Sequence, residues 1–380
     1  MSNRLRMYHI IFRSVCKVLD TLRVTRQRNL ARMVTGIYLG QHVHLSKIAN
    51  HLRGASQLTS KVKRLRRFVA NKMVDVRANY TLYAQTVIEA AAASERLRLL
   101  IDTTELPGTR HILMVAIAYS RRSIPLIWKL LRSTSVTDSD TQRNPLEALA
   151  SWLPDKITPV LIGDGEFHSI DLMAWLQEEG GHFRPRLHKD TFVLLPHGAW
   201  IQPQDIDIRP GKGRYLQQVY LSQGKYGPVN LAITWNPDED EPWYIVTDQV
   251  ADYYTLVGYS RRMWIEEMFG DFKDGRFHLQ KSRLWQPERL SRLLLALCIA
   301  YTWLIHLGAY LIKERGWRYL VDRTDRRDRS LPNLACLWLQ RCLNTDECIM
   351  SASDPIPGAK CTVAGARTKK TKVPVPGRPV

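Results

Sequence analysis

The chain has 380 residues, of which 45% are hydrophobic and 24% charged, and its formal net charge is +19. This composition indicates a soluble globular protein of two or three domains, and six cysteines in such a length exclude a disulfide scaffold. The excess of lysine and arginine favours a polyanionic partner, because phosphate backbones attract these side chains whatever the base sequence.

Residues 1–90 are predicted to be all-helical and to bind DNA. The first 72 residues hold sixteen lysines and arginines and one acid, Asp20. A short helix is expected over residues 45–52, then a break at Gly54, then a second helix that begins at Thr59 or Ser60. The second helix has an apolar face that contains Val62, Leu65, Phe68 and Val69, and five basic residues cover its other sides: Lys61, Lys63, Arg64, Arg66 and Arg67. The pattern favours a helix-turn-helix whose second helix contacts DNA, with a solvated basic helix as the alternative.

From residue 96 the pattern changes to strands. The apolar run "RLRLLID" ends on Asp102, two further strands follow, and after a helix the run "TPVLIGDGEF" reaches Asp164. Strands interleaved with helices predict a mixed α/β sheet. Each aspartate stands where an apolar strand is expected to end, which would expose both carboxylates at one edge of a rigid sheet.

Two later segments are predicted to be structural. Residues 187–250 alternate apolar and polar positions, as in "GPVNLAITW", and are expected to form a β-rich insertion. Residues 293–312 form an uncharged apolar run long enough to span a bilayer. Because polar side chains interrupt this run and it continues an amphipathic region, we predict a buried core helix and no membrane span.

The segment "YSRRMWIEEMFGDFKDG", residues 259–275, places acids within a very basic chain. A helical projection at ~100° per residue brings Tyr259, Arg262, Glu266 and Lys273 onto one side. An apolar stripe lies beside them and consists of Ile265, Met268, Phe269 and Phe272, with Trp264 at its margin. The projection turns Glu267, Asp271 and Asp274 toward solvent. One interpretation is an amphipathic surface helix with charge pairs four residues apart; the other is a cation-binding carboxylate flanked by groups that hold a phosphate.

The four residues Tyr259, Arg262, Glu266 and Lys273 fit the pattern Y-x2-R-x3-E-x6-K, which resembles the signature of bacterial DDE transposases of the insertion sequence 4 family. Asp102 with the following Thr103–Thr104 is similar to the family's first catalytic aspartate, and "GDGEF" resembles its second-aspartate motif, with Asp164 as the acid. The similarity covers about residues 96–310. One departure is that some relatives have tryptophan directly after the signature arginine, whereas here Met263 precedes Trp264.

The resemblance implies an α/β fold with a ribonuclease-H-like mixed sheet and a β-rich insertion, preceded by an all-helical DNA-binding domain. The expected domains are residues 1–90 for DNA end binding, 91–320 for catalysis with the insertion at about 187–250, and 321–380 for a C-terminal helical segment and basic tail. It also implies two Mg²⁺ ions, replaceable by Mn²⁺, held by Asp102, Asp164 and Glu266, while Tyr259, Arg262 and Lys273 bind DNA phosphates.

The function implied is metal-dependent cleavage and strand transfer of an insertion sequence in the bacterial cytoplasm, at the nucleoid. The DNA partners would be terminal inverted repeats and target DNA, and two chains would pair in the synaptic complex. Residues 320–350 offer an apolar surface for such pairing, with the alternative that they cover their own core. A ribonuclease-H-like nuclease or resolvase, and a helix-turn-helix regulator without catalysis, remain as other functions.

Overall fold

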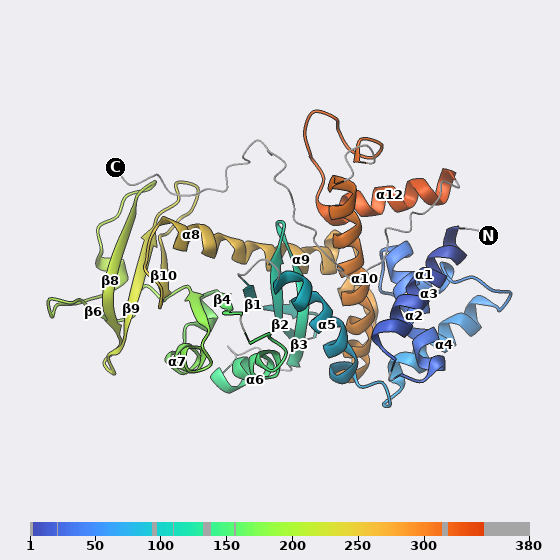
Figure 1. Ribbon diagram of the computed structural model, residues 1–380, viewed down its shortest axis with the longest axis horizontal. Coiled ribbons are helices and arrows are strands. Elements are labelled where there is room, and N and C mark those ends of the chain that lie inside the picture. The colour runs from blue at the N-terminus through green and yellow to red at the C-terminus, as the bar shows by residue number, and fades with distance from the viewer. Residues whose placement is uncertain are drawn as a thin grey trace.

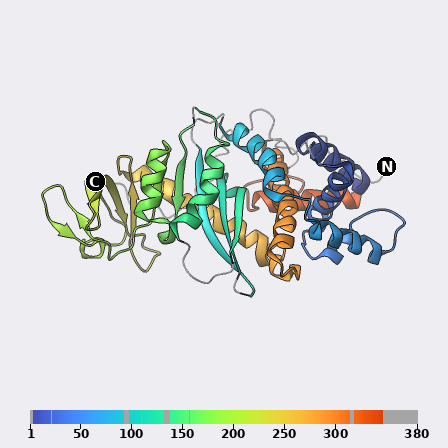
Figure 2. The ribbon, with the colours of Figure 1, turned by 90° about the horizontal axis from the view of Figure 1, so that it is seen from below.

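The computed structural model of the protein describes residues 3–20, 22–92, 97–108, 110–131, 138–155, 157–313 and 318–345. Along the longest axis, N-terminal helices are followed by a central sheet and then by a second sheet (Figure 1). The view from below shows the same order (Figure 2).

The N-terminal part is helical, as predicted. Its helices are α1 (Asn3–Val18), α2 (Val24–Gly40), α3 (Leu45–Asn50), α4 (Leu58–Ala70) and α5 (Val76–Ala92). Helix α4 begins at Leu58 after Gln57, which makes no side-chain cap, so the predicted start at Thr59 or Ser60 is wrong by one or two residues. The apolar face of α4 is confirmed, because Leu65, Phe68 and Val69 are buried and Val62 is partly buried.

The central sheet has five strands in the order β3-β2-β1-β4-β5. Strands β1 (Arg98–Leu106), β2 (Arg110–Tyr119) and β3 (Arg122–Leu131) are antiparallel neighbours, whereas β4 (Val160–Gly163) and β5 (His182–Pro185) run parallel to β1. Along the chain, helix α6 (Ser139–Ala150) lies between β3 and β4, and helix α7 (Ile170–Glu178) lies between β4 and β5. The predicted mixed α/β sheet is therefore confirmed.

The second sheet confirms the β structure predicted for residues 187–250. It contains β6 (Val193–Leu194), β7 (Trp200–Ile201), β8 (Gly213–Leu221), β9 (Tyr226–Thr234) and β10 (Trp243–Thr247), in the order β10-β9-β8-β6-β7. Arg186, just after β5, forms a bridge with Ile245 of β10, and the Leu187 N–H donates to the Tyr244 carbonyl at 2.7 Å. These contacts attach the second sheet to the edge of the first.

Residues 253–275 form one nearly continuous helical segment that passes from β10 toward the central sheet (Figure 1). It consists of α8 (Tyr253–Tyr259), a 3₁₀ turn (Ser260–Arg262), α9 (Met263–Gly270) and a π turn (Asp271–Gly275). Asp252 caps its start by accepting a hydrogen bond from the Thr255 N–H at 2.9 Å. The predicted apolar stripe is confirmed, since Ile265, Met268, Phe269 and Phe272 are all buried.

Asp271 is buried, so its predicted exposure to solvent is wrong. Its carboxylate accepts hydrogen bonds from Arg122 Nε of β3 at 3.2 Å and from the Tyr301 hydroxyl at 3.0 Å, and Arg276 Nε lies 3.8 Å away. Burial raises the pKa of Asp271, while Arg122 and Arg276 oppose the rise. A helical projection cannot reveal such partners, because Arg122 lies 149 residues earlier in the chain.

Helix α10 (Pro287–Lys313) confirms the predicted core helix. It is long and apolar enough to cross a membrane, yet 83% of its most apolar stretch is buried inside the structure. Helix α12 (Leu331–Thr345) packs on it so closely that a Cβ at Gly308 would stand 2.2 Å from the Leu331 carbonyl oxygen. Leu331, Leu334, Trp338 and Leu339 of α12 are buried within the same chain. Within residues 320–345, the part of this segment that the structure describes, these side chains cover their own core, as in the second alternative.

We expect Asp271→Ala to lower the free energy of unfolding by about 3 kcal/mol, because it leaves Arg122 and Arg276 partly buried without their common carboxylate. The matched control is Asp274→Ala. Asp274 lies in the same turn, is exposed and accepts one hydrogen bond, from Gln280, so its loss should cost less than about 0.5 kcal/mol. Urea denaturation of both variants measures the difference, and equal losses would contradict the structural role of Asp271.

Candidate active site

Asp102 and Asp164 lie at the same level on neighbouring parallel strands. Leu100 of β1 is paired with Ile162 of β4, and each aspartate stands two residues further on. Residues two apart on a strand share a face, and neighbouring strands lie ~4.8 Å apart. Both carboxylates therefore project from the same face, near the end of the sheet at which β4 stops. Strand β1 itself continues to Leu106, because it pairs with β2 along its whole length. The predicted strand end at Asp102 is therefore wrong, although the pairing with β4 does stop before it.

Local hydrogen bonds hold both aspartates. The Thr103 N–H donates to Asp102 Oδ1 at 2.8 Å, and the Glu166 N–H donates to Asp164 Oδ1 at 2.9 Å. The turn after β4 requires glycine at 163, because a Cβ there would lie 2.7 Å from the Phe167 Cβ. Asp102 is only 7% exposed.

The helical segment brings a third carboxylate toward the same end of the sheet. Glu266 on α9 forms an ion pair with Arg262 one turn earlier, with Nη1 and Oε1 2.5 Å apart. Tyr259 is buried, packs edge-on against Trp243 of β10 and interacts with Arg262. The ion pair four residues apart that the first interpretation predicts is therefore present, and the cation-binding role of Glu266 stays a prediction.

The pKa values show that these side chains share one electrostatic environment. Burial, together with the charges of Asp164 and Glu266, raises the pKa of Asp102 to about 7, and Arg262 opposes the rise. For Arg262, burial lowers the pKa, but Tyr259, Glu266, Asp102 and Asp164 together outweigh it and the pKa is raised. Arg262, which is half-buried, thus feels the charges of three carboxylates, which come from β1, from the turn after β4 and from α9.

The sequence matches the family model described as "Transposase DDE domain" over residues 93–303. This match covers more than half of the chain. The protein belongs to the DDE transposase family. A comparison with curated proteins finds no match. Family membership makes this chain a transposase that acts on DNA, in a family that generally depends on divalent metal ions.

Lys273 lies where the helical segment ends in a π turn. Its backbone angles are non-helical (φ −80°, ψ −122°), and the chain changes direction after it, where the His278 N–H donates to the Lys273 carbonyl at 2.8 Å. The Lys273 side chain is half-buried. Its assignment to DNA phosphate binding stays a prediction.

The oxygen ligands of the transposase fit a hard divalent cation such as Mg²⁺. The raised pKa of Asp102 reflects an excess of buried negative charge that a cation would neutralise. Among the described residues, however, no group of three or more His, Cys, Asp or Glu side chains is arranged to hold a metal ion. Glu266 is engaged by Arg262 instead. The ligand chemistry therefore fits a divalent cation, while Glu266 Oε1 is paired with Arg262 in this structure.

The basic residues of α4 lie apart from the carboxylates. Lys63, Arg66 and Arg67 are exposed, as a DNA-contacting role requires, and Arg64 is half-buried. Lys61 differs, because its Nζ donates to the Leu52 carbonyl at 2.6 Å and so closes the turn after α3. Its assignment to DNA contact is weakened by this bond, while the roles of the others stay predictions.

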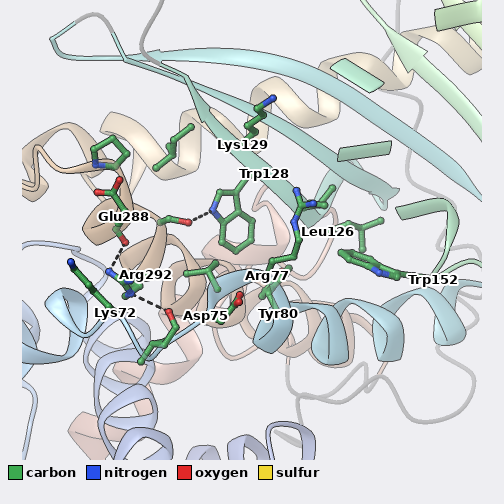
Figure 3. Close-up of a pocket in the computed structure, with 16 residues that line it drawn as sticks. Lys72, Asp75, Arg77, Tyr80, Leu126, Trp128, Lys129, Trp152, Glu288 and Arg292 are labelled. Carbon is green, nitrogen blue, oxygen red and sulfur yellow. Dashed lines mark hydrogen bonds between the residues drawn. The ribbon is translucent and has the colours of Figure 1, made fainter. Parts of the chain in front are cut away.

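A cavity of about 480 Å³ lies between β3, α10 and the link from α4 to α5 (Figure 3). Arg292 of α10 crosses it and donates to the carbonyls of Val69 and Val74, each at 3.1 Å. Trp128 of β3 donates from Nε1 to Ser291 Oγ at 3.1 Å. None of the three carboxylates lines this cavity. Its lining residues come from the N-terminal helical part, from β3 and from α10, so the cavity lies where the helical part joins the central sheet.

We expect Asp102→Asn to stabilise the transposase, and more so as the pH rises from 4 to 7. The folded-state pKa of Asp102 is raised from 3.8 to about 7, so ionisation costs stability above pH 3.8 and the full cost, roughly 4 kcal/mol, is present above pH 7. Asparagine removes the cost. Thermal unfolding at several pH values measures this gain, with Glu105→Gln, exposed on the same strand, as the control. A gain that does not change with pH would contradict the electrostatic cause.

Proposed function

We propose that this transposase carries out metal-dependent strand cleavage and strand transfer, moving an insertion sequence by a cut-and-paste route. The observation that carries the proposal is the position of Asp102 and Asp164 at one level of two parallel strands, with the Glu266 charge acting on Asp102. The strand order β3-β2-β1-β4-β5, antiparallel then parallel, supports a ribonuclease-H-like assignment of the sheet. The resemblance of the signature helix to the insertion sequence 4 family supports the finer family assignment. Its substrate would lie at the nucleoid, in the bacterial cytoplasm.

Each residue has a distinct task in this proposal. Asp102, Asp164 and Glu266 would be the residues that hold the Mg²⁺ ions, through their carboxylate oxygens. When bound, the two ions activate the attacking water or 3′-hydroxyl and stabilise the leaving oxygen. In this role Glu266 would give up its ion pair with Arg262 and bind a metal ion instead. The Arg262 guanidinium would then be available for a DNA phosphate at the scissile bond. Tyr259, buried behind Arg262, limits where that guanidinium can lie.

The three carboxylates should be needed for cleavage and dispensable for DNA binding. We expect Asp102→Ala, Asp164→Ala and Glu266→Ala each to reduce strand cleavage by on the order of a thousandfold or more. Gel-shift binding to the DNA ends should change little in all three. The matched control is Glu267→Ala, because Glu267 is the next residue, is exposed and pairs with Arg122. Equal loss of cleavage in Glu266→Ala and Glu267→Ala would show that Glu266 is the wrong carboxylate.

Pairing of two chains follows from the same proposal, because joining both ends of an element to one target requires coordinated cleavage. A chain with Lys63, Arg66 and Arg67 replaced by alanine should bind ends poorly, and a Glu266→Ala chain should bind but not cut. If each chain cuts the end held by its partner, a mixture of the two should recover cleavage that neither shows alone. A mixture that stays inactive, with both chains folded and one chain per DNA end by light scattering, would exclude the paired mechanism.

A further inference from the structure

A group of basic residues lies where the N-terminal helices meet the turn that follows the signature helix. We call it the seam cluster. Its members come from the loop after α2, from α3, from α4 and from the 3₁₀ turn η5 (Leu279–Ser282) with its flanks. They are His42, His44, Lys47, Arg66, His278, Lys281 and Arg283.

Direct contacts fix the two sides of the seam against each other. The Val43 N–H donates to the Phe277 carbonyl at 3.0 Å, and Arg276 Nη1 donates to Gln41 Oε1 at 3.0 Å. The rings of His42 and His278 lie 4.9 Å apart. Residues more than 230 positions apart in the chain therefore form one surface.

The charges that act most on His42 and His44 are positive. Burial, followed by the charges of His278, His44, Lys47 and Lys281, lowers the pKa of His42 to about 4. Burial also lowers the pKa of His44, followed by Arg283, Lys47 and Arg66. No carboxylate is among these effects; Asp274, in the neighbouring turn, accepts a hydrogen bond from Gln280. Repulsion between like charges costs stability, so the grouping of Lys47, Arg66, Lys281 and Arg283 favours an anion from outside the chain.

The donors of the seam cluster are oriented by the backbone. His42 Nδ1 accepts the His44 N–H at 2.9 Å, so the neutral His42 ring carries its proton on Nε2 and can donate it. His278 Nδ1 is buried and has no hydrogen-bond partner. His278 and Arg283, on either side of η5, have left-handed backbones (φ 54° and 57°), a conformation that non-glycine residues rarely adopt. Strain of this kind persists where it holds side chains in a required direction.

We propose that the seam cluster binds phosphates of the DNA end and thereby clamps the duplex contacted by α4 to the catalytic sheet. Arg66 belongs both to the exposed face of α4 and to the seam cluster, so the two surfaces are continuous. Lys47, Lys281 and Arg283 are exposed and supply the charge, while His42 supplies a directed donor from Nε2. The choice of DNA as the ligand rests on the proposed function; the anion site itself rests on the geometry.

The full-length Lys281→Ala/Arg283→Ala variant tests this site, because both side chains are exposed and the fold should tolerate their loss. The slope of log affinity against log salt concentration should become shallower by about 1 to 2, since each lost phosphate contact removes ~0.9. Lys225→Ala/Arg209→Ala is the matched control: it removes the same charge from exposed positions of the second-sheet region and should leave the slope nearly unchanged. Equal slopes for the two double variants would overturn the proposal.

Two further measurements identify the ligand. Methylphosphonate placed at single positions of the DNA end should weaken wild-type binding at one or two sites, and these same sites should become silent in Lys281→Ala/Arg283→Ala. Inorganic pyrophosphate titrated alone should release no specific heat; tight binding that the double variant loses would assign the site to a free anion and overturn the DNA clamp. These readouts measure binding only, so a chain that binds in this way but cuts no DNA would disprove the proposed function and leave the clamp standing.

Discussion

The position of the signature helix depends on one buried carboxylate, Asp271. Its partners are Arg122 of β3, Tyr301 of α10 and Arg276, and Arg276 in turn donates to Gln41, at the end of α2, and to Asn333 and Cys336 of α12. The central sheet, the core helix, the N-terminal helices and the C-terminal helix therefore meet at one ion-pair network. Removing one member of such a network leaves buried charges without partners, which strongly destabilises the fold. Glu266 lies on the same helix little more than one turn before Asp271, so the network also fixes how close Glu266 stands to Asp102.

The active-site carboxylates carry a cost that the fold meets internally. Three acids near one sheet edge repel one another, and burial of Asp102 adds to the penalty, as its pKa of about 7 shows. Arg262 offsets part of this by lying among them as a built-in cation. The proposed chemistry thus explains why a very basic chain holds these acids. Carboxylates close together repel one another, and a bound cation removes that repulsion.

Much of the fold could be predicted from periodicity, because periodicity reports burial. The stripe of Ile265, Met268, Phe269 and Phe272, the helical N-terminus and the core helix α10 follow from apolar spacing alone. The projection did not reveal the π turn that ends the segment at residues 271–275, because a helical wheel assumes one regular period. It also failed for Asp271, because acids usually face water and only a partner remote in sequence reverses this. The shared level of Asp102 and Asp164 required the register of β1 and β4, which no local pattern encodes.

The burial of α12 limits which surfaces are available for pairing of two chains. Its leucines and Trp338 fill the core beside α10, so they cannot also form a dimer surface without exposing that core. The large exposed aromatic side chains lie elsewhere, for example Phe192 and Trp200 in the second sheet and Trp285 in the loop before α10. Trp285, 65% exposed, stacks under Arg110 of the β1–β2 hairpin, 4.9 Å from its guanidinium carbon. An arginine on an exposed indole suits contact with a polyanion better than packing against a second apolar surface. Pairing of two chains is therefore more readily explained by shared DNA than by a preformed protein interface.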